Sequence, residues 1–145
     1  MIHTLTDGNG LPLANRTTAA NGNEREELVP LIDSIKVKTG KRGRPRKRLK
    51  VIAADKGYDC QKQRAALRRR GIRPQLPKRV WKGKRKRGRP IKNSVPRFQQ
   101  ERCFAWYQRK YRRLVVRWER IAACFNGFLA IATIHMWINR ILLVG

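Results

Sequence analysis

An aspartate directly follows a short apolar run near the middle of the chain. Residues 51–54 are Val-Ile-Ala-Ala, Asp55 comes next, and Gly57 follows two residues later. Such a run is typical of a buried strand, and the glycine indicates the turn that ends it. Ligands and catalytic groups often lie at the C-terminal edge of a helix-covered sheet, because the loops there are open while the strand holds them rigid. We therefore predict a functional carboxylate at Asp55; the alternative is that it only caps the following helix.

A second carboxylate stands at the tip of a predicted hairpin. Residues 1–13 show the pattern of a strand, a turn and a second strand, and the turn Asp7-Gly8-Asn9-Gly10 is a strong hairpin signal. Glycine and asparagine tolerate the positive φ that such turns require. The alternation of a strand places Asp7 on the same face as His3 and Leu5. The alternative is that Asp7 serves only as a turn residue.

The composition limits the classes of partner. The chain has 145 residues, enough for one domain with one core, and 41% of them are hydrophobic. Thirty-six Lys and Arg face nine Asp and Glu, which gives a formal net charge of +27. So large a positive charge favours a polyanion, and nucleic acid fits better than a membrane because its repeated phosphates can neutralise charge along the whole chain.

The cysteines and one apolar segment indicate in which cellular compartment the protein works. Cys60, Cys103 and Cys124 are odd in number and widely spaced, which predicts neither a disulfide framework nor a zinc site and indicates a reducing, cytoplasmic compartment. The segment Ile121–Val144 is apolar, but polar residues such as Arg140 interrupt it, so we expect a buried helix and no membrane span.

The periodicity predicts further elements. In chain order they are a strand at Ala14–Ala20, a helix at Glu24–Ile35, a helix at Cys60–Arg70, a strand at Ile72–Leu76 and a helical segment at 96–144. Asn23 is expected to cap the first of these helices, and the acids of its first turn suit the helix dipole. In the last segment Glu101 and Glu119 are the only acids, and on one continuous helix they would lie about 27 Å apart.

Two loops carry most of the basic residues. Residues 36–50 and 78–92 each contain nine Lys or Arg, and each holds a Gly-Arg-Pro core, at 43–45 and at 88–90. These cores resemble the AT-hook, whose arginines lie in the narrow minor groove of A·T-rich DNA. The alternative is a solvated loop that contacts phosphates without reading the sequence.

Three segments together resemble the DDE transposases of bacterial insertion sequences, in the branch with an RNase H-like catalytic domain. Thr6–Leu13 resembles the strand and hairpin of the first aspartate, Ala54–Asp59 resembles the second-aspartate motif, and Gln100–Trp106 resembles the glutamate helix. The three acids are 48 and 46 residues apart, and the resemblance covers almost the whole chain. Three motifs in the right order are far more specific than one.

The resemblance implies a metal-dependent phosphoryl transfer that cuts and joins DNA strands. Asp7, Asp55 and Glu101 would be the catalytic triad and would bind two Mg²⁺ or Mn²⁺ ions, since hard cations prefer carboxylate oxygens. Ser94 and Gln108 depart from the Tyr and Lys that the family often carries, and Arg109 or Lys110 could replace that lysine. The side chains expected to contact DNA are Arg42, Arg44, Arg46, Lys47, Arg87, Arg89, Arg97, Arg109, Lys110, Arg112 and Arg113.

The fold implied is α/β: an RNase H-like mixed sheet flanked by helices, with the two basic loops and a C-terminal helical segment, forming one catalytic domain over residues 1–145. Relatives carry an additional N-terminal region, so we expect either a truncated element or the downstream half of a split reading frame. Its partners would be transposon ends, target DNA, and either further copies of itself or an upstream reading-frame product. The alternatives are a non-catalytic, AT-hook-like architectural DNA-binding protein and a basic protein assembled on RNA.

Overall fold

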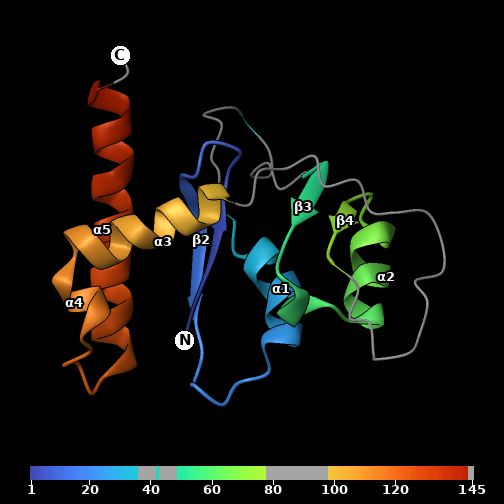
Figure 1. The fold of residues 1–145 in the computed structure, drawn as a ribbon, viewed down its shortest axis with the longest axis horizontal. Coiled ribbons are helices and arrows are strands. Elements are labelled where there is room, and N and C mark those ends of the chain that lie inside the picture. Colours follow the sequence, from blue (N-terminus) through green and yellow to red (C-terminus); the bar gives the residue numbers. More distant parts are fainter. Residues whose placement is uncertain (36–41, 43–48, 78–97, 144–145) are drawn as a thin grey trace. The chain divides into compact units, whose positions relative to one another are not determined.

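The computed structural model describes residues 1–35, 42, 49–77 and 98–143. The chain forms two compact units: unit 1 comprises Met1–Ala19 and Phe98–Gly145, and unit 2 comprises Ala20–Arg97. Each unit contains both strands and helices, so the predicted α/β class is confirmed (Figure 1). The described strands form two separate two-stranded sheets, one in each unit. The RNase H-like topology stays a prediction.

Unit 1 begins with an antiparallel hairpin. β1 (Ile2–Thr6) pairs with β2 (Pro12–Thr17), and the two strands diverge from regular pairing only next to the turn, between Leu5 and Thr6. The turn contains Gly10 at a φ of +86°, a conformation that favours glycine. The hairpin predicted from the Asp-Gly-Asn-Gly sequence is therefore confirmed.

The predicted third strand at Ala14–Ala20 is wrong. Residues 14–17 continue β2, with Ala14 opposite Leu5 and Thr17 opposite Ile2. No turn residue interrupts the extended pattern at Ala14, so the strand runs on until its pairing partner ends.

The core of unit 1 lies between this hairpin and two helices. α3 (Phe98–Lys110) crosses α5 (Ala122–Leu143), as Figure 1 shows. Their contact buries a cluster made of Cys103, Tyr107, Leu129, Ala132 and Met136. Burial of apolar side chains of this kind contributes most of the stabilisation that a small domain has.

Hydrogen bonds fix α5 to the hairpin. Asn15 Nδ2 donates to Thr133 Oγ1 at 2.8 Å and to Tyr107 Oη at 3.2 Å. Trp137 Nε1 donates to the carbonyl of Pro12 at 2.8 Å. Because buried polar groups are costly without partners, these bonds specify one position of α5 against β2.

The C-terminal part is helical but not continuous, in contrast to the single helix expected across Glu101 and Glu119. The short helix α4 (Arg112–Val115) follows α3, and residues 116–121 are not helical. Val116 is extended, with φ −107° and ψ 108°. The neighbouring β-branched residues Val115 and Val116 have low helix propensity, which explains a break at this point.

The sequence analysis predicted a buried helix here, and this prediction is wrong. Only one stripe of α5 is buried. Among the described residues it is the one helix long and apolar enough to cross a membrane by length and composition, and 22% of its most apolar window is buried. Unit 1 therefore buries apolar side chains on one face of α5 only. The number of apolar residues in a helix does not show how many of its faces are packed against other elements.

Unit 2 opens with α1 (Glu24–Asp33). Asn23 caps it as predicted, its side chain accepting a hydrogen bond from the backbone N–H of Arg25 at 3.2 Å. The acids of the first turn are present at the positive end of the helix dipole, as expected. The apolar residues at helical spacing are buried: Leu28, Leu31, Ile32 and, just beyond the helix, Ile35.

The rest of unit 2 is a strand, a helix and a parallel strand. β3 (Val51–Ala53) and β4 (Arg73–Gln75) pair in parallel, and α2 (Gln61–Arg69) connects them (Figure 1). Gly71 ends the connection at a φ of +71°. The strand ahead of Asp55, the following helix and the second strand are therefore all confirmed. A parallel pair joined by a helix places the end of β3 at an open sheet edge.

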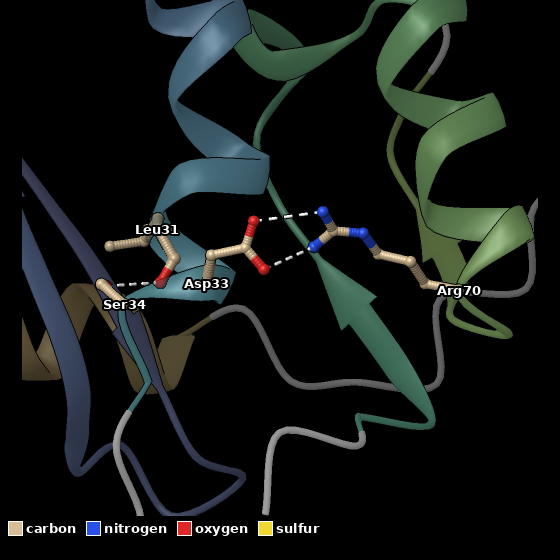
Figure 2. Close-up of polar contacts among 4 residues, drawn as sticks. All are labelled: Leu31, Asp33, Ser34 and Arg70. Atoms are coloured by element: carbon tan, nitrogen blue, oxygen red, sulfur yellow. Dashed lines mark hydrogen bonds and ion pairs between the residues drawn. The ribbon is translucent and has the colours of Figure 1, made fainter. Parts of the chain in front are cut away.

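An ion pair joins the ends of α1 and α2. Figure 2 shows the guanidinium of Arg70 facing the carboxylate of Asp33, with Nη1 and Nη2 donating to the two oxygens at 2.8 and 3.1 Å. The hydroxyl of Ser34, the C-cap of α1, donates to the carbonyl of Leu31 at 2.7 Å. Both partners of the ion pair are partly exposed, so its contribution to stability is small.

Candidate active site

Asp7 holds the hairpin turn through one of its two carboxylate oxygens. Oδ1 accepts from the backbone N–H of Asn9 at 2.9 Å and of Leu11 at 2.8 Å. Asp7 therefore stabilises the turn, as the alternative interpretation expected. Within the described part of the chain no donor bonds the second oxygen, Oδ2, and the side chain is half-buried. The turn thus orients a carboxylate that keeps an oxygen for a further ligand.

The tip of this hairpin contacts the first turn of α3. A Cβ added at Gly10 would lie 3.0 Å from the backbone oxygen of Gln99, two residues before Glu101. Glu101 is exposed on that same first turn. Unit 1 thereby places Asp7 and Glu101 on two elements that touch, although they are 94 residues apart in the sequence.

The negative charge of Asp7 affects the pKa of a cysteine in α3. Burial, and after it the negative charge of Asp7, raises the pKa of the Cys103 thiol to about 12. Cys103 is fully buried in the core cluster and is therefore a neutral thiol at ordinary pH. The cysteine is an apolar packing residue beside the candidate site and has no thiolate chemistry.

Asp55 lies just beyond β3, as predicted. It occupies the N-cap position of a short 3₁₀ turn, η1 (Lys56–Tyr58), and its side chain is exposed. The side chain makes no capping hydrogen bond to this turn. The interpretation of Asp55 as only a helix cap is therefore wrong, and its carboxylate stands at the open edge of the β3–β4 sheet.

Two glutamates of α1 lie near the turn that follows Asp55, and reasoning from sequence alone assigned them only to the helix dipole. Burial raises the pKa of Tyr58 to about 12, with further contributions from the charges of Glu24, Asp55 and Glu27. A Cβ added at Gly57 would lie 2.7 Å from Glu24 Oε2. The first turn of α1 therefore adds negative charge beside the Asp55 turn, a neighbourhood that only the folded chain reveals.

A largely buried ion pair fixes the segment that follows this turn. Arg64 Nε donates to Asp59 Oδ1 at 2.7 Å, and Arg64 Nη2 donates to the carbonyl of Leu76 at 2.7 Å. Arg64 thus connects the segment after Asp55 to the residue that follows β4. Because charge-assisted bonds of this length are strong, they fix the loop at the end of β3.

The basic residues of α3 and α4 are exposed, as a DNA-contacting role requires. Those predicted to contact DNA are Arg109, Lys110, Arg112 and Arg113, and Arg102 of α3 is exposed as well. Arg113 is engaged within unit 1, since it pairs with Glu119 at 3.0 Å and lies 5.3 Å from the centre of the Phe128 ring. Arg42 is exposed as well. The remaining predicted contacts lie outside the described residues: Arg44, Arg46, Lys47, Arg87, Arg89 and Arg97.

The three predicted catalytic acids divide between the two units. Asp7 and Glu101 belong to unit 1 and Asp55 belongs to unit 2. Within the described residues no three His, Cys, Asp or Glu side chains form a group that could hold a metal ion. The convergence of all three acids stays a prediction.

Comparison with known proteins identifies the class. The model of the family described as Transposase DDE domain matches residues 1–137, nearly the whole chain. The chain therefore belongs to the DDE transposase family, and the resemblance found in the three motifs is confirmed.

A particular relative is the putative transposase for insertion sequence element IS402 of Burkholderia cepacia. It is 42% identical over 127 residues, which make up 88% of this chain and 57% of that protein. The chain thus spans little more than half the length of this relative. No solved structure gives a significant match.

Proposed function

We propose that this chain is the catalytic part of an insertion-sequence transposase, which cuts and joins DNA strands by metal-dependent phosphoryl transfer. The family match over residues 1–137 is the observation that carries the proposal. It is supported by the structure of unit 1, where the hairpin that orients Asp7 packs against the helix turn that carries Glu101. Asp55 would complete the triad.

The carboxylates fit divalent cations. Mg²⁺ and Mn²⁺ take oxygen ligands, and Asp7 keeps Oδ2 for such a ligand while Asp55 and Glu101 are exposed. Two ions held by Asp7, Asp55 and Glu101 would supply charge stabilisation to the attacking and the leaving oxygen of an in-line displacement at phosphorus. The protein would contribute the fixed orientation of the three carboxylates and would bind the DNA on either side of the reacting phosphate.

DNA is the proposed partner, and the charge distribution supports it. The net charge of +27 favours binding to a polyanion with repeated phosphates. Arg109 and Lys110 are exposed at the C-terminal end of the helix that carries Glu101. Either residue would contact a phosphate near the reacting one, in the role of the lysine that the family often places at Gln108. A DNA-acting protein of this class would work in the cytoplasm, on the nucleoid.

Recognition of transposon ends is proposed to need more than this chain. The relative from Burkholderia cepacia is longer, and the chain covers 57% of it. We expect this chain to bind DNA broadly and to recognise terminal-repeat DNA together with a further protein segment or a partner. Strand-transfer assays on terminal-repeat DNA would reject this expectation if the chain alone showed full end-specific activity.

Cleavage and binding must be separated to test the catalytic proposal. Supercoiled plasmid is incubated with the chain and Mg²⁺ or Mn²⁺, and nicking is compared for the wild type and Asp55→Asn. The proposal predicts that nicking is lost in the variant while DNA affinity stays unchanged within about twofold, because one charge in +27 contributes little to phosphate binding. Equal nicking by both proteins would reject the role of Asp55. Tight binding without nicking by the wild type would favour the architectural alternative.

A further inference from the structure

α5 carries a second apolar stripe on the side away from the core. It consists of four isoleucines, which we call the isoleucine ladder: Ile131, Ile134, Ile138 and Ile141, exposed by 64%, 57%, 46% and 65%. The buried stripe of the same helix consists of Phe125, Leu129, Ala132 and Met136. With about 100° of rotation per residue, the two stripes point to opposite sides of the helix. The ladder is therefore an apolar face that unit 1 does not cover.

The spacing of the isoleucines in the ladder indicates that the partner is another helix. The steps between successive isoleucines are three, four and three residues, which is the a and d pattern of a helix that packs lengthwise against another helix. The same steps continue upstream to Gly127 and Cys124, both exposed. Isoleucine side chains at these positions insert into the spaces of a facing helix with the same pattern, and every copy of this chain supplies one.

The charge distribution favours a second copy over an acidic partner. Arg140 is the only charged residue in α5, and it lies off the ladder, on the flank toward the buried stripe. In a chain of net charge +27 most surfaces repel a second copy, but this face does not. An acidic protein or a DNA phosphate would find nothing to pair with on the ladder.

The anchoring of α5 argues against a membrane as the occupant. Trp137 is bonded to Pro12, and Thr133 is bonded to Asn15 and Tyr107. A helix that moved into a bilayer would lose these bonds, and its polar groups would be left without partners in hydrocarbon. A partner that lies along one face leaves them intact.

We propose that the isoleucine ladder is the contact through which copies of this chain associate, with α5 packed lengthwise against α5 of another copy. This goes beyond the proposed catalytic function and does not depend on it. The helix is about 33 Å long, so the contact is at the small end of specific interfaces, which bury roughly 1,200–2,000 Å². We therefore expect association in the micromolar range.

The test is sedimentation equilibrium of the full chain, freed of nucleic acid and held in about 0.5 M salt to screen repulsion. The variant carries Ile134→Glu and Ile138→Glu. The matched control carries Val115→Glu and Val116→Glu, which add the same charge at side chains of similar exposure, 54% and 52%, outside α5. Circular dichroism confirms that all three proteins are folded.

The proposal predicts that the wild type and the control reach at least twice the monomer mass between about 1 and about 100 μM. The ladder variant should stay monomeric, with association weakened at least about 100-fold, because the carboxylates would be buried without compensating charge. A monomeric wild type at the highest concentration would overturn the proposal. Association that is equal in the variant and the wild type would overturn it as well.

A flotation assay with neutral phosphatidylcholine vesicles tests whether the isoleucine ladder binds lipid instead of another copy of the chain. The proposal predicts that the wild type and the ladder variant both remain in solution. Flotation of the wild type that the Ile134→Glu, Ile138→Glu variant loses would assign the ladder to lipid and contradict the contact between copies.

Discussion

Arg64 Nε lies 2.7 Å from Asp59 Oδ1, and the two side chains are only 11% and 14% exposed. This pair and the bond from Arg64 to Leu76 hold the loop that begins at Asp55. Replacing Arg64 by Met removes two charge-assisted hydrogen bonds, one to the largely buried carboxylate of Asp59 and one to the carbonyl of Leu76. We expect a loss of about 3 kcal/mol in the free energy of unfolding, measured by urea denaturation.

The control for Arg64 is the exposed pair in the same unit. Arg70 and Asp33 have side chains exposed by 39% and 50%, so Arg70→Met should cost less than about 1 kcal/mol. Equal losses for the two variants would show that burial of the Arg64–Asp59 pair carries no special weight.

The turn and catalytic roles of Asp7 can be separated by substitution. Asn at position 7 retains an Oδ1 that can accept from the backbone of Asn9 and Leu11, but it has no charge. Asp7→Asn should leave the thermal midpoint within a few degrees of the wild type and abolish nicking of DNA, whereas Asp7→Ala should lower both. Residual nicking by Asp7→Asn at the wild-type rate would limit Asp7 to its turn role.

The contact between the hairpin and α3 can be tested at Gly10. An Ala there is strained by the φ of +86° and also meets the backbone oxygen of Gln99 at 3.0 Å. Gly71→Ala is the control, since it has a φ of +71° and nothing within 4 Å. Gly71→Ala should cost about 1 kcal/mol of unfolding free energy, and Gly10→Ala clearly more. Denaturant titration gives both values, and equal losses would mean that the Gln99 contact is unimportant.

The buried thiol predicts an alkaline loss of stability. Burial, with a smaller contribution from Asp7, raises the pKa of Cys103 from 9.0 to about 12 in the folded chain. Between these values the unfolded chain releases the thiol proton and the folded chain keeps it, so the free energy of unfolding falls as pH rises above 9. Cys103→Ala should reduce this slope in urea titrations at increasing pH. An unchanged slope would show that Cys103 ionises equally in both states.

Local patterns predicted the elements that local chemistry determines. The Asp7–Gly10 hairpin and the Asn23 cap depend on residues close in the sequence, and both are confirmed. The supposed strand at Ala14–Ala20 failed because pairing with β1, a contact between segments, decides where β2 ends.

Contacts between distant segments explain what the sequence did not reveal. The closeness of Glu24 to Gly57 depends on α1 packing beside η1, and the touch of Gly10 and Gln99 joins residues 89 positions apart. The apolar content of α5 was visible, but the division into a buried stripe and an exposed ladder appears only when the helix is packed. The class of protein was recognisable because three acids with their flanking residues occur in order, independently of how the chain folds.

Binding of Mn²⁺ tests most directly whether Asp7, Asp55 and Glu101 form one site. Isothermal titration calorimetry would compare the wild type with Asp7→Asn, Asp55→Asn and Glu101→Gln, each shown to be folded. We expect the wild type to bind Mn²⁺ and each single substitution to weaken this binding at least about tenfold, since all three carboxylates would ligate the same ions. Wild-type affinity in any one of the three variants would contradict a shared metal site.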